Sequence, residues 1–324
     1  MKILVLVLQS DFYEPVNNFF IPQSLTELNH SVFLGDVNSL QILNGQVITR
    51  IAKFKNSKVG EKHVFMEEYH SCEDFDLCWL LDYSHPNKID DFFRILWVLE
   101  GRIKFVNLPS SIFFLNNKIG MQRLSESKFY NNSVLLDSDK IVSIVDKSPP
   151  EEKWVIKAPN KGCGADVFVL HSEDKNKKAI IESAVGNPKQ LYEMYGKTIH
   201  GFAEQYAVLQ KYIPNLDKTE SRVLLAGGKI LGGYRKIPAK GDFRGNYLIG
   251  GKCTPLELNN DTQNLSLKIA KELMKFGINF AGIDIAYPHL IELNLVNPGG
   301  ISGHLEATGE DIGKEVCKAV LEKV

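Results

Sequence analysis

Short apolar runs separated by amphipathic segments mark the first third of the chain. The segments Pro15–Asn29 and Lys88–Glu100 carry apolar residues at helical spacing and predict helices. Around them lie apolar runs that predict buried strands: Ile3–Leu8, Ser31–Leu34, Leu77–Leu81 and Lys104–Val106. Strands that alternate with helices are typical of a mostly parallel sheet. We therefore expect residues 1–115 to form an α/β domain.

One segment and two tryptophans of this region are interpreted from the types of residue present, not from a periodic pattern. The segment Asn44–Glu67 mixes β-type residues with charges and is expected to be irregular strand and loop. Trp79 and Trp97 stand among apolar residues, which favours core packing over contact with a ligand.

The pattern changes from Asn116 onward. A short helical stretch, Ile119–Leu124, precedes a loop that ends in Ser148-Pro149-Pro150. Beyond it we expect strands and helices at Trp154–Ala158, Asp166–Leu170, Phe202–Tyr212, Arg222–Ala226, Ile230–Tyr234, Asp261–Phe276 and Asp311–Lys323. The Gly227-Gly228 pair predicts a hairpin turn. At 324 residues the chain exceeds what one core usually supports, so several domains are expected.

Polar residues interrupt the apolar strands near the end of the chain in a pattern that indicates a metal site. Two strands meet at a turn near Pro288, and antiparallel pairing would place Asp284 opposite Glu292. Glu292 and Asn294 are two residues apart and share a face. Oxygen ligands of this kind suit Mg²⁺. The alternative is a two-sided hairpin with polar residues facing water.

Two further segments carry candidate chemistry. Lys157 ends a predicted strand before Pro159-Asn160-Lys161-Gly162-Cys163-Gly164, where an ammonium and backbone N–H groups can surround phosphate oxygens. The alternative for Lys157 is a surface position at the edge of an ordinary hairpin. Lys236–Gly251, rich in glycine and basic residues, is a candidate mobile lid with Lys240 and Arg244 as anion donors, or else a solvated loop.

Composition narrows the function classes. The hydrophobic content of 44% and charged content of 24% are ordinary for a globular protein. A net charge of −1 argues against a nucleic-acid or anionic-membrane partner. Five cysteines without a C-x-x-C pair favour a reducing compartment, and no apolar run approaches a membrane span. A cytoplasmic protein is expected.

The order of these motifs resembles the ATP-grasp ligases, and within them bacterial glutathione synthetase. The similarity rests on the lysine before the glycine loop, Gln210-Lys-Tyr-Ile-Pro214, Arg222, Ile237-Pro-x-x-Gly-x-x-Arg-Gly-Asn246, Gly282-x-Asp284 and Glu292-x-Asn294. It implies an ATP-grasp fold with an N-terminal Rossmann-like (pre-ATP-grasp) parallel-sheet domain. The expected division is a substrate domain (1–115), a small lid subdomain (116–209) and a C-terminal catalytic subdomain (210–324).

The resemblance implies a role for each matching residue. Lys118 and Lys157, with Gly162 and Gly164, would hold ATP phosphates. The strand end at Gln210, Lys211, Tyr212 and Ile213 would act as a hinge whose backbone pairs with adenine. Asp284, Glu292 and Asn294 would bind Mg²⁺, or Mn²⁺ in its place. Arg222, Arg244 and Asn246 would act in catalysis. Asn297, Gly299 and Gly300 would bind the substrate. A homo-oligomer acting on small molecules is implied.

Two departures from the family pattern leave the substrates open. Leu81-Asp-Tyr-Ser-His-Pro-Asn-Lys88 stands where the family has Arg-x-Asp-Pro-Pro-Phe-Asp, and Asn297-Pro-Gly-Gly-Ile-Ser302 replaces Ser-Pro-Thr followed by Arg. The expected activity is ATP-dependent joining of γ-glutamylcysteine and glycine through an acyl phosphate. The alternatives are a ligase for another acid and amine, or a nucleotide-binding protein without turnover. A positive φ is expected at Gly300, where valine would crowd an acceptor.

Overall fold

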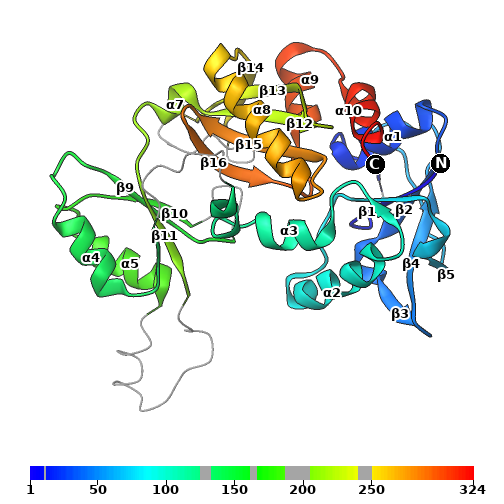
Figure 1. Ribbon diagram of the computed structural model, residues 1–324, viewed down its shortest axis with the longest axis horizontal. Helices are drawn as coiled ribbons and strands as arrows, with labels where there is room; N and C mark the ends of the chain where they lie inside the picture. The colour runs from blue at the N-terminus through cyan, green and yellow to red at the C-terminus, as the bar shows by residue number, and fades with distance from the viewer. Residues whose placement is uncertain (11, 125–132, 161–165, 187–204, 240–249) are drawn as a thin grey trace.

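Three β-sheets with their helices make up the protein, which we describe from a computed structural model. The structure describes residues 1–324 except 11, 125–132, 161–165, 187–204 and 240–249. The N-terminal sheet lies at one end of the long axis, the second sheet at the other end and the third between them, and the two termini lie close together (Figure 1).

The first sheet has the parallel centre that the alternation of strands and helices predicts. Its order is β3-β4-β2-β1-β6-β7, with β5 paired to β4. β2, β1, β6 and β7 are parallel, and β3, β4 and β5 are antiparallel additions. The elements are β1 (Lys2–Val7), α1 (Asn17–Glu27), β2 (Ser31–Asp36), η1 (Val37–Ser39), β3 (Gln41–Leu43), β4 (Gln46–Lys53), β5 (Tyr69–Ser71), η2 (Cys72–Asp74), β6 (Leu77–Leu80), η3 (Pro86–Lys88), α2 (Ile89–Glu100) and β7 (Lys104–Phe105).

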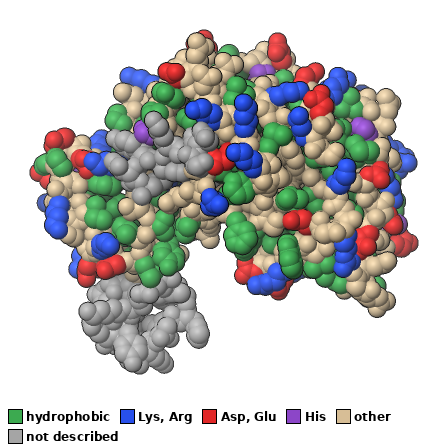
Figure 2. Space-filling model, viewed as in Figure 1, with side chains coloured by type: hydrophobic (Ala, Val, Ile, Leu, Met, Phe, Trp, Pro, Cys, Tyr) green, Lys and Arg blue, Asp and Glu red, His purple; other side chains and the backbone are tan. Residues whose placement is uncertain are grey.

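Two expectations for this region are wrong. The segment Asn44–Glu67 is not irregular throughout, because β4 is a regular strand whose Val47, Ile51 and neighbours pack into the core. Its burial on both faces removes the alternation that would have revealed it. Trp79 is 1% exposed, as expected, but Trp97 is 64% exposed on the outer side of α2. Figure 2 shows hydrophobic side chains gathered over α2 and α3 (Pro109–Leu115).

The second sheet has the order β10-β9-β11-β8 and a small core of its own. Helices α4 and α5 pack on it through apolar side chains that include Ile141, Val145, Ile181 and Val185. Its elements, after the short turn η4 (Gly120–Arg123), are β8 (Ser133–Leu135), α4 (Ser138–Asp146), β9 (Trp154–Lys157), β10 (Val167–Leu170), α5 (Lys177–Val185) and β11 (Ala207–Lys211).

The third sheet is antiparallel in the order β14-β13-β12-β15-β16. The predicted hairpin turns through Gly227 and Gly228, which have φ of +56° and +79° as a two-residue turn of this kind requires. The elements are α7 (Leu216–Thr219), β12 (Ser221–Ala226), β13 (Lys229–Ile237), β14 (Lys252–Pro255), α8 (Asn260–Lys275), β15 (Phe280–Ala286), β16 (His289–Asn294), α9 (Gly300–Thr308) and α10 (Gly313–Leu321).

The first and third sheets share hydrophobic cores. Both large clusters of buried residues contain side chains from β1 and from β12, and the Trp79 and Phe280 rings pack edge to face at 5.4 Å. Asn107 also connects the two sheets, because its buried Nδ2 donates to the carbonyls of Phe280 (2.6 Å) and Leu295 (2.8 Å). This packing fixes the end of the parallel sheet against β15 and β16, whereas the second sheet keeps its own core.

Candidate nucleotide and metal site

Two buried lysines lie near each other between the second and third sheets. Lys157 ends β9, a strand flanked by β10 and β11, and Lys118 follows α3; each is 7% exposed. The surface-edge alternative for Lys157 is therefore wrong. Lys118 Nζ lies 2.9 Å from Glu292 Oε1, and the pKa of Lys157 falls to about 8 because burial and the Lys118 charge disfavour its ammonium form. Two desolvated cations at one place favour an anionic ligand.

A network of four charged side chains lies on the third sheet beside this pair. Asp284, 1% exposed, accepts from Arg222 Nε at 2.5 Å and Nη2 at 2.9 Å. Lys236 Nζ lies 2.8 Å from both Asp284 Oδ2 and Glu220 Oε1. Burial alone would raise the pKa of Asp284, but Arg222 and Lys236 hold it well below its usual range. The network keeps a carboxylate charged inside the protein.

The predicted pairing of the two metal-site strands is confirmed. Asp284 faces Glu292 and Gly282 faces Asn294, with a bulge directly after Asp284. The alternative in which Asp284 faces water is wrong, because that side chain is buried. Within the described residues, Asn294 Nδ2 is buried without a hydrogen-bond partner, and no three His, Cys, Asp or Glu side chains gather as a metal site.

The donor set of these residues is compatible with Mg²⁺. Glu292 uses Oε1 for Lys118, and a carboxylate oxygen accepts about two bonds, so lone pairs remain on Glu292 and on Asp284. Two carboxylates and the amide oxygen of Asn294 are hard ligands, too few to enclose the ion alone. Mg²⁺ characteristically takes its other ligands from water and phosphate.

The predicted adenine hinge lies at the place where the chain leaves the second sheet. Gln210 is 4% exposed and Ile213 is 8% exposed, while Lys211 Nζ pairs with Glu152 at 2.6 Å. The backbone N–H of Tyr212 donates to the Lys153 carbonyl at 2.9 Å. Gln210 and Lys211 end β11, and Tyr212 and Ile213 lead from it towards α7 and the third sheet.

The turn after β16 corrects the expectation for Gly300. Gly299 has the positive φ, +64°, whereas Gly300 begins α9 and a Cβ there would lie 2.6 Å from Leu224 Cδ1. A valine at Gly300 would therefore disturb the core. Asn297 Nδ2 donates to Asn18 Oδ1 at 2.7 Å, and Arg222 Nη1 donates to the Pro298 carbonyl.

Four predicted site residues lie outside the described residues: Gly162, Gly164, Arg244 and Asn246. The same holds for Lys240 and most of the predicted lid. Lys236, placed in that lid by composition, instead belongs to β13 and contacts Asp284.

The sequence analysis missed three polar residues at this site. Glu220 and Lys236 form the outer part of the Asp284 network. Asn116 accepts from the Leu295 N–H at 2.9 Å and donates to the Tyr83 hydroxyl. Lys236 could have been found from the sequence, because it lies two residues after Tyr234 and so on the same face of the strand. No sequence pattern marks the partners of Asn116.

Comparison with known proteins agrees with this geometry. The family described as prokaryotic glutathione synthetase, ATP-grasp domain, matches residues 117–309. Glutathione synthetase from Prochlorococcus marinus is 25% identical over 230 residues, covering 71% of this chain and 69% of that protein. The enzyme from Synechocystis is 20% identical over 305 residues, covering 91% of each.

Solved structures share the whole fold. A RiPP-associated ATP-grasp ligase from Chryseobacterium gregarium, in complex with ADP and a leader and core peptide, has a TM-score of 0.64 at 16% identity, covering 100% of this chain and 97% of that one. Fold and family match together define an ATP-grasp protein and an ATP-dependent ligase. The chain belongs to the prokaryotic glutathione synthetase ATP-grasp family. No helix among the described residues is long and apolar enough to cross a membrane.

Proposed function

We propose that this ligase joins a carboxylic acid to an amine through an acyl phosphate, with γ-glutamylcysteine and glycine as substrates and glutathione, ADP and phosphate as products. The observation that carries the proposal is the buried pair of Lys118 and Lys157 beside the facing Asp284 and Glu292. Cations fixed before the reaction stabilise the charge that develops on a transferring phosphoryl group.

The first step would form a bond between a carboxylate oxygen of the acid and the γ-phosphorus of ATP, while the bond from that phosphorus to the ADP oxygen breaks. Lys118 and Lys157 would hold the phosphate oxygens during this transfer. Arg222 already uses one N–H on each guanidinium nitrogen, for Asp284 and Pro298. Of the five donors of a guanidinium, two remain for the phosphoryl group.

The second step would form the amide. The amine nitrogen attacks the acyl carbon, the carbon–oxygen bond to phosphate breaks, phosphate leaves with the electron pair, and the nitrogen loses a proton. Because an acyl phosphate hydrolyses readily, exclusion of water is needed until the amine arrives. We assign this role to the part of the predicted lid that follows β13, with Arg244 and Asn246 as donors. The loop with Gly162 and Gly164 would bind the phosphates.

Metal and nucleotide binding complete the proposal. Asp284, Glu292 and Asn294 would hold Mg²⁺ or Mn²⁺, which neutralises charge on the phosphate oxygens of ATP. The backbone of Gln210, Lys211, Tyr212 and Ile213 would pair with adenine. Asn297, Gly299 and Gly300 would line the acceptor side, where Gly299 gives the backbone its turn into α9.

A second candidate is the same reaction on another acid and amine. The turn after β16 presents no arginine to fix a substrate carboxylate, and the Leu81–Lys88 segment departs from the family pattern. The related ligase of known structure is described with a peptide. A nucleotide-binding protein without turnover is the third candidate, and the intact Arg222, Asp284, Glu292 and Asn294 set disfavours it.

Phosphate release from ATP tests the three candidates. The full chain is incubated with ATP, Mg²⁺ and a panel of acids and amines that begins with γ-glutamylcysteine and glycine, and the products are identified by mass spectrometry. Phosphate release that needs both of these substrates, with glutathione formed, supports the proposal. Release with another pair supports the second candidate, and no release with any pair contradicts ligase activity toward these substrates.

A further inference from the structure

Asp82 stands at the carboxyl edge of the parallel sheet, two residues beyond the end of β6. The chain passes from β1 to β2 on one side, and β6 pairs with β1 on the other. The ends of β1 and β6 therefore border the point where the strand order reverses, which is where ligands bind in open α/β sheets. Asp82 belongs to the segment Leu81–Lys88. This segment departs from the family pattern, which is why the sequence does not identify the substrates.

The contacts of Asp82 leave its negative charge without a cation. Its Oδ2 accepts from the Leu8 N–H at 2.8 Å and from Asn18 Nδ2, and no Lys, Arg or His among the described residues forms an ion pair with it. Burial, opposed by these two hydrogen bonds and aided by the nearby Glu14 charge, raises the pKa of Asp82. A half-buried carboxylate in this state favours a cationic partner.

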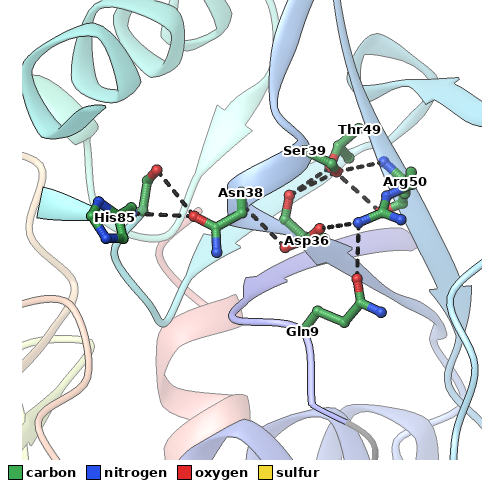
Figure 3. A network of polar contacts seen from close by, with 8 residues as sticks. Gln9, Asp36, Asn38, Ser39, Thr49, Arg50 and His85 are labelled. Atoms are coloured by element: carbon green, nitrogen blue, oxygen red, sulfur yellow. Dashed lines mark hydrogen bonds and ion pairs between the residues drawn. The ribbon is translucent and has the colours of Figure 1, made fainter. Parts of the chain in front are cut away.

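The neighbouring strand end shows the opposite arrangement. Asp36, at the end of β2, pairs with Arg50 Nη2 at 2.8 Å, and the same nitrogen donates to Gln9 Oε1 at 2.9 Å (Figure 3). The side chain of Asn38 connects this network to the backbone of His85. Arg50 is thus already neutralised by a buried carboxylate, whereas no cation among the described residues is paired with Asp82.

Asp82 is tied to the candidate ligase site by two hydrogen-bonded routes. Through Asn18 it reaches Asn297 in the turn before α9. Through its neighbour Tyr83 it reaches Asn116, which accepts from the Leu295 N–H directly after the metal-site strand β16. The segment that carries Asp82 is therefore connected to the chain directly after β16, the strand that carries Glu292 and Asn294. The residue next to Asn18, Asn17, is fully buried, and neither of its amide atoms is hydrogen-bonded to a described residue.

We propose that Asp82, positioned by Asn18, binds the ammonium group of the acid substrate, so that the enzyme selects carboxylic acids that carry a free amino group. This inference rests on the proposed ligase function and names the substrate class of that site. The ammonium concerned is one that does not react. An ionised carboxylate keeps a bound amine protonated, and a protonated amine has no lone pair with which to attack an acyl phosphate.

The test uses the full chain, ATP, Mg²⁺, glycine and acids in matched free-amine and N-acetyl forms, with γ-glutamylcysteine and N-acetyl-γ-glutamylcysteine as the first pair and glutamate and N-acetylglutamate as the second. Asp82→Asn keeps the shape of the side chain and removes its charge. Asp76→Asn is the matched control, because Asp76 accepts from the Lys2 N–H at 2.7 Å at the opposite end of the same strand pair.

For Asp82→Asn we expect the KM of the free-amine acid to rise about 10- to 100-fold, as for loss of a hydrogen-bonded charge, while the KM values of ATP and glycine stay within about twofold. The preference for the free amine over its N-acetyl form should fall by the same factor. Asp76→Asn should change neither quantity. Circular dichroism of both variants establishes that they fold.

Separate outcomes contradict the inference and the proposed function. If another free-amine acid replaces γ-glutamylcysteine and its KM depends on Asp82, the glutathione assignment is wrong and the inference stands. If the wild-type protein uses N-acetyl acids equally well, or if Asp82→Asn changes only the KM of glycine, the inference is wrong even when glutathione forms. If no acid in the panel supports phosphate release, both are wrong.

Discussion

Two aspartates, the buried Asp284 and the half-buried Asp82, differ in their counterions. Asp284 has Arg222 and Lys236 within 3 Å, and their charges lower its pKa despite complete burial. Asp82 receives only neutral donors, and burial raises its pKa. The first carboxylate is stabilised by the protein itself. The second has no counterion among the described residues, so the two carboxylates differ in how much of their charge the protein itself neutralises.

Removal of the Asp284 charge should have the largest effect on stability. Asp284→Asn leaves Arg222 and the Lys236–Glu220 pair with an excess of buried positive charge, and breaking such a network costs about 3–5 kcal/mol. Asp82→Asn should cost less than about 1 kcal/mol, because an amide oxygen can still accept from Leu8 and no cation loses its partner. Urea unfolding measures both; equal losses would contradict the distinction.

Loss of the Glu292 charge should act on turnover with little effect on the fold. Glu292→Gln keeps the shape but removes a negative charge that faces Lys118 and the proposed metal, so ATP-dependent phosphate release should fall about 10²- to 10³-fold, as for one charge-stabilising group. Glu322→Gln, which breaks an exposed pair with Lys229, is the control and should retain activity. Wild-type turnover of Glu292→Gln at saturating Mg²⁺ would exclude Glu292 as a ligand.

The depressed pKa of Lys157 should make ATP binding depend on pH. The free protein loses this proton near pH 8, and the phosphates of bound ATP would raise the pKa again, so binding above pH 8 takes up a proton. The dissociation constant should rise up to about tenfold per pH unit above 8. Calorimetry in buffers of different ionisation enthalpy measures the uptake. Lys157→Met should abolish it, whereas exposed Lys178→Met should not.

The smallest expected effect is the pH dependence of stability that Asp82 contributes, which is opposite in sign to that of Asp284. The lowered pKa of Asp284 gives stability that is present above its unfolded value of 3.8 and is lost as the pH falls. The raised pKa of Asp82 gives the opposite sign, with stability present below 3.8 and lost as the pH rises through the folded value. As the pH rises from 4 to 7, the unfolding free energy of the wild type should therefore fall relative to that of Asp82→Asn.

The sequence alone determined the features that depend on local period and spacing. Alternation between strands and helices gave the parallel sheet around β1, and the positions of Asp284 and Glu292 around a turn gave their register, because side-chain direction on a strand follows residue number. The resemblance supplied the ATP-grasp fold, which the family match confirms. Local pattern could not reveal β4, since a strand buried on both faces has no alternation, or the exposure of Trp97 on α2.

Only the tertiary structure decided which charges meet. Arg222, Lys236 and Asp284 come from three different strands, and Asp82 joins Asn18 and Asn297 from positions as far as 279 residues apart. Their separation in sequence carries no periodic signal, because electrostatic and hydrogen-bonded contacts depend on distance in space and on burial. The same residue type therefore has a lowered pKa at position 284 and a raised one at position 82, and the fold supplies the difference through the partners that it brings within reach.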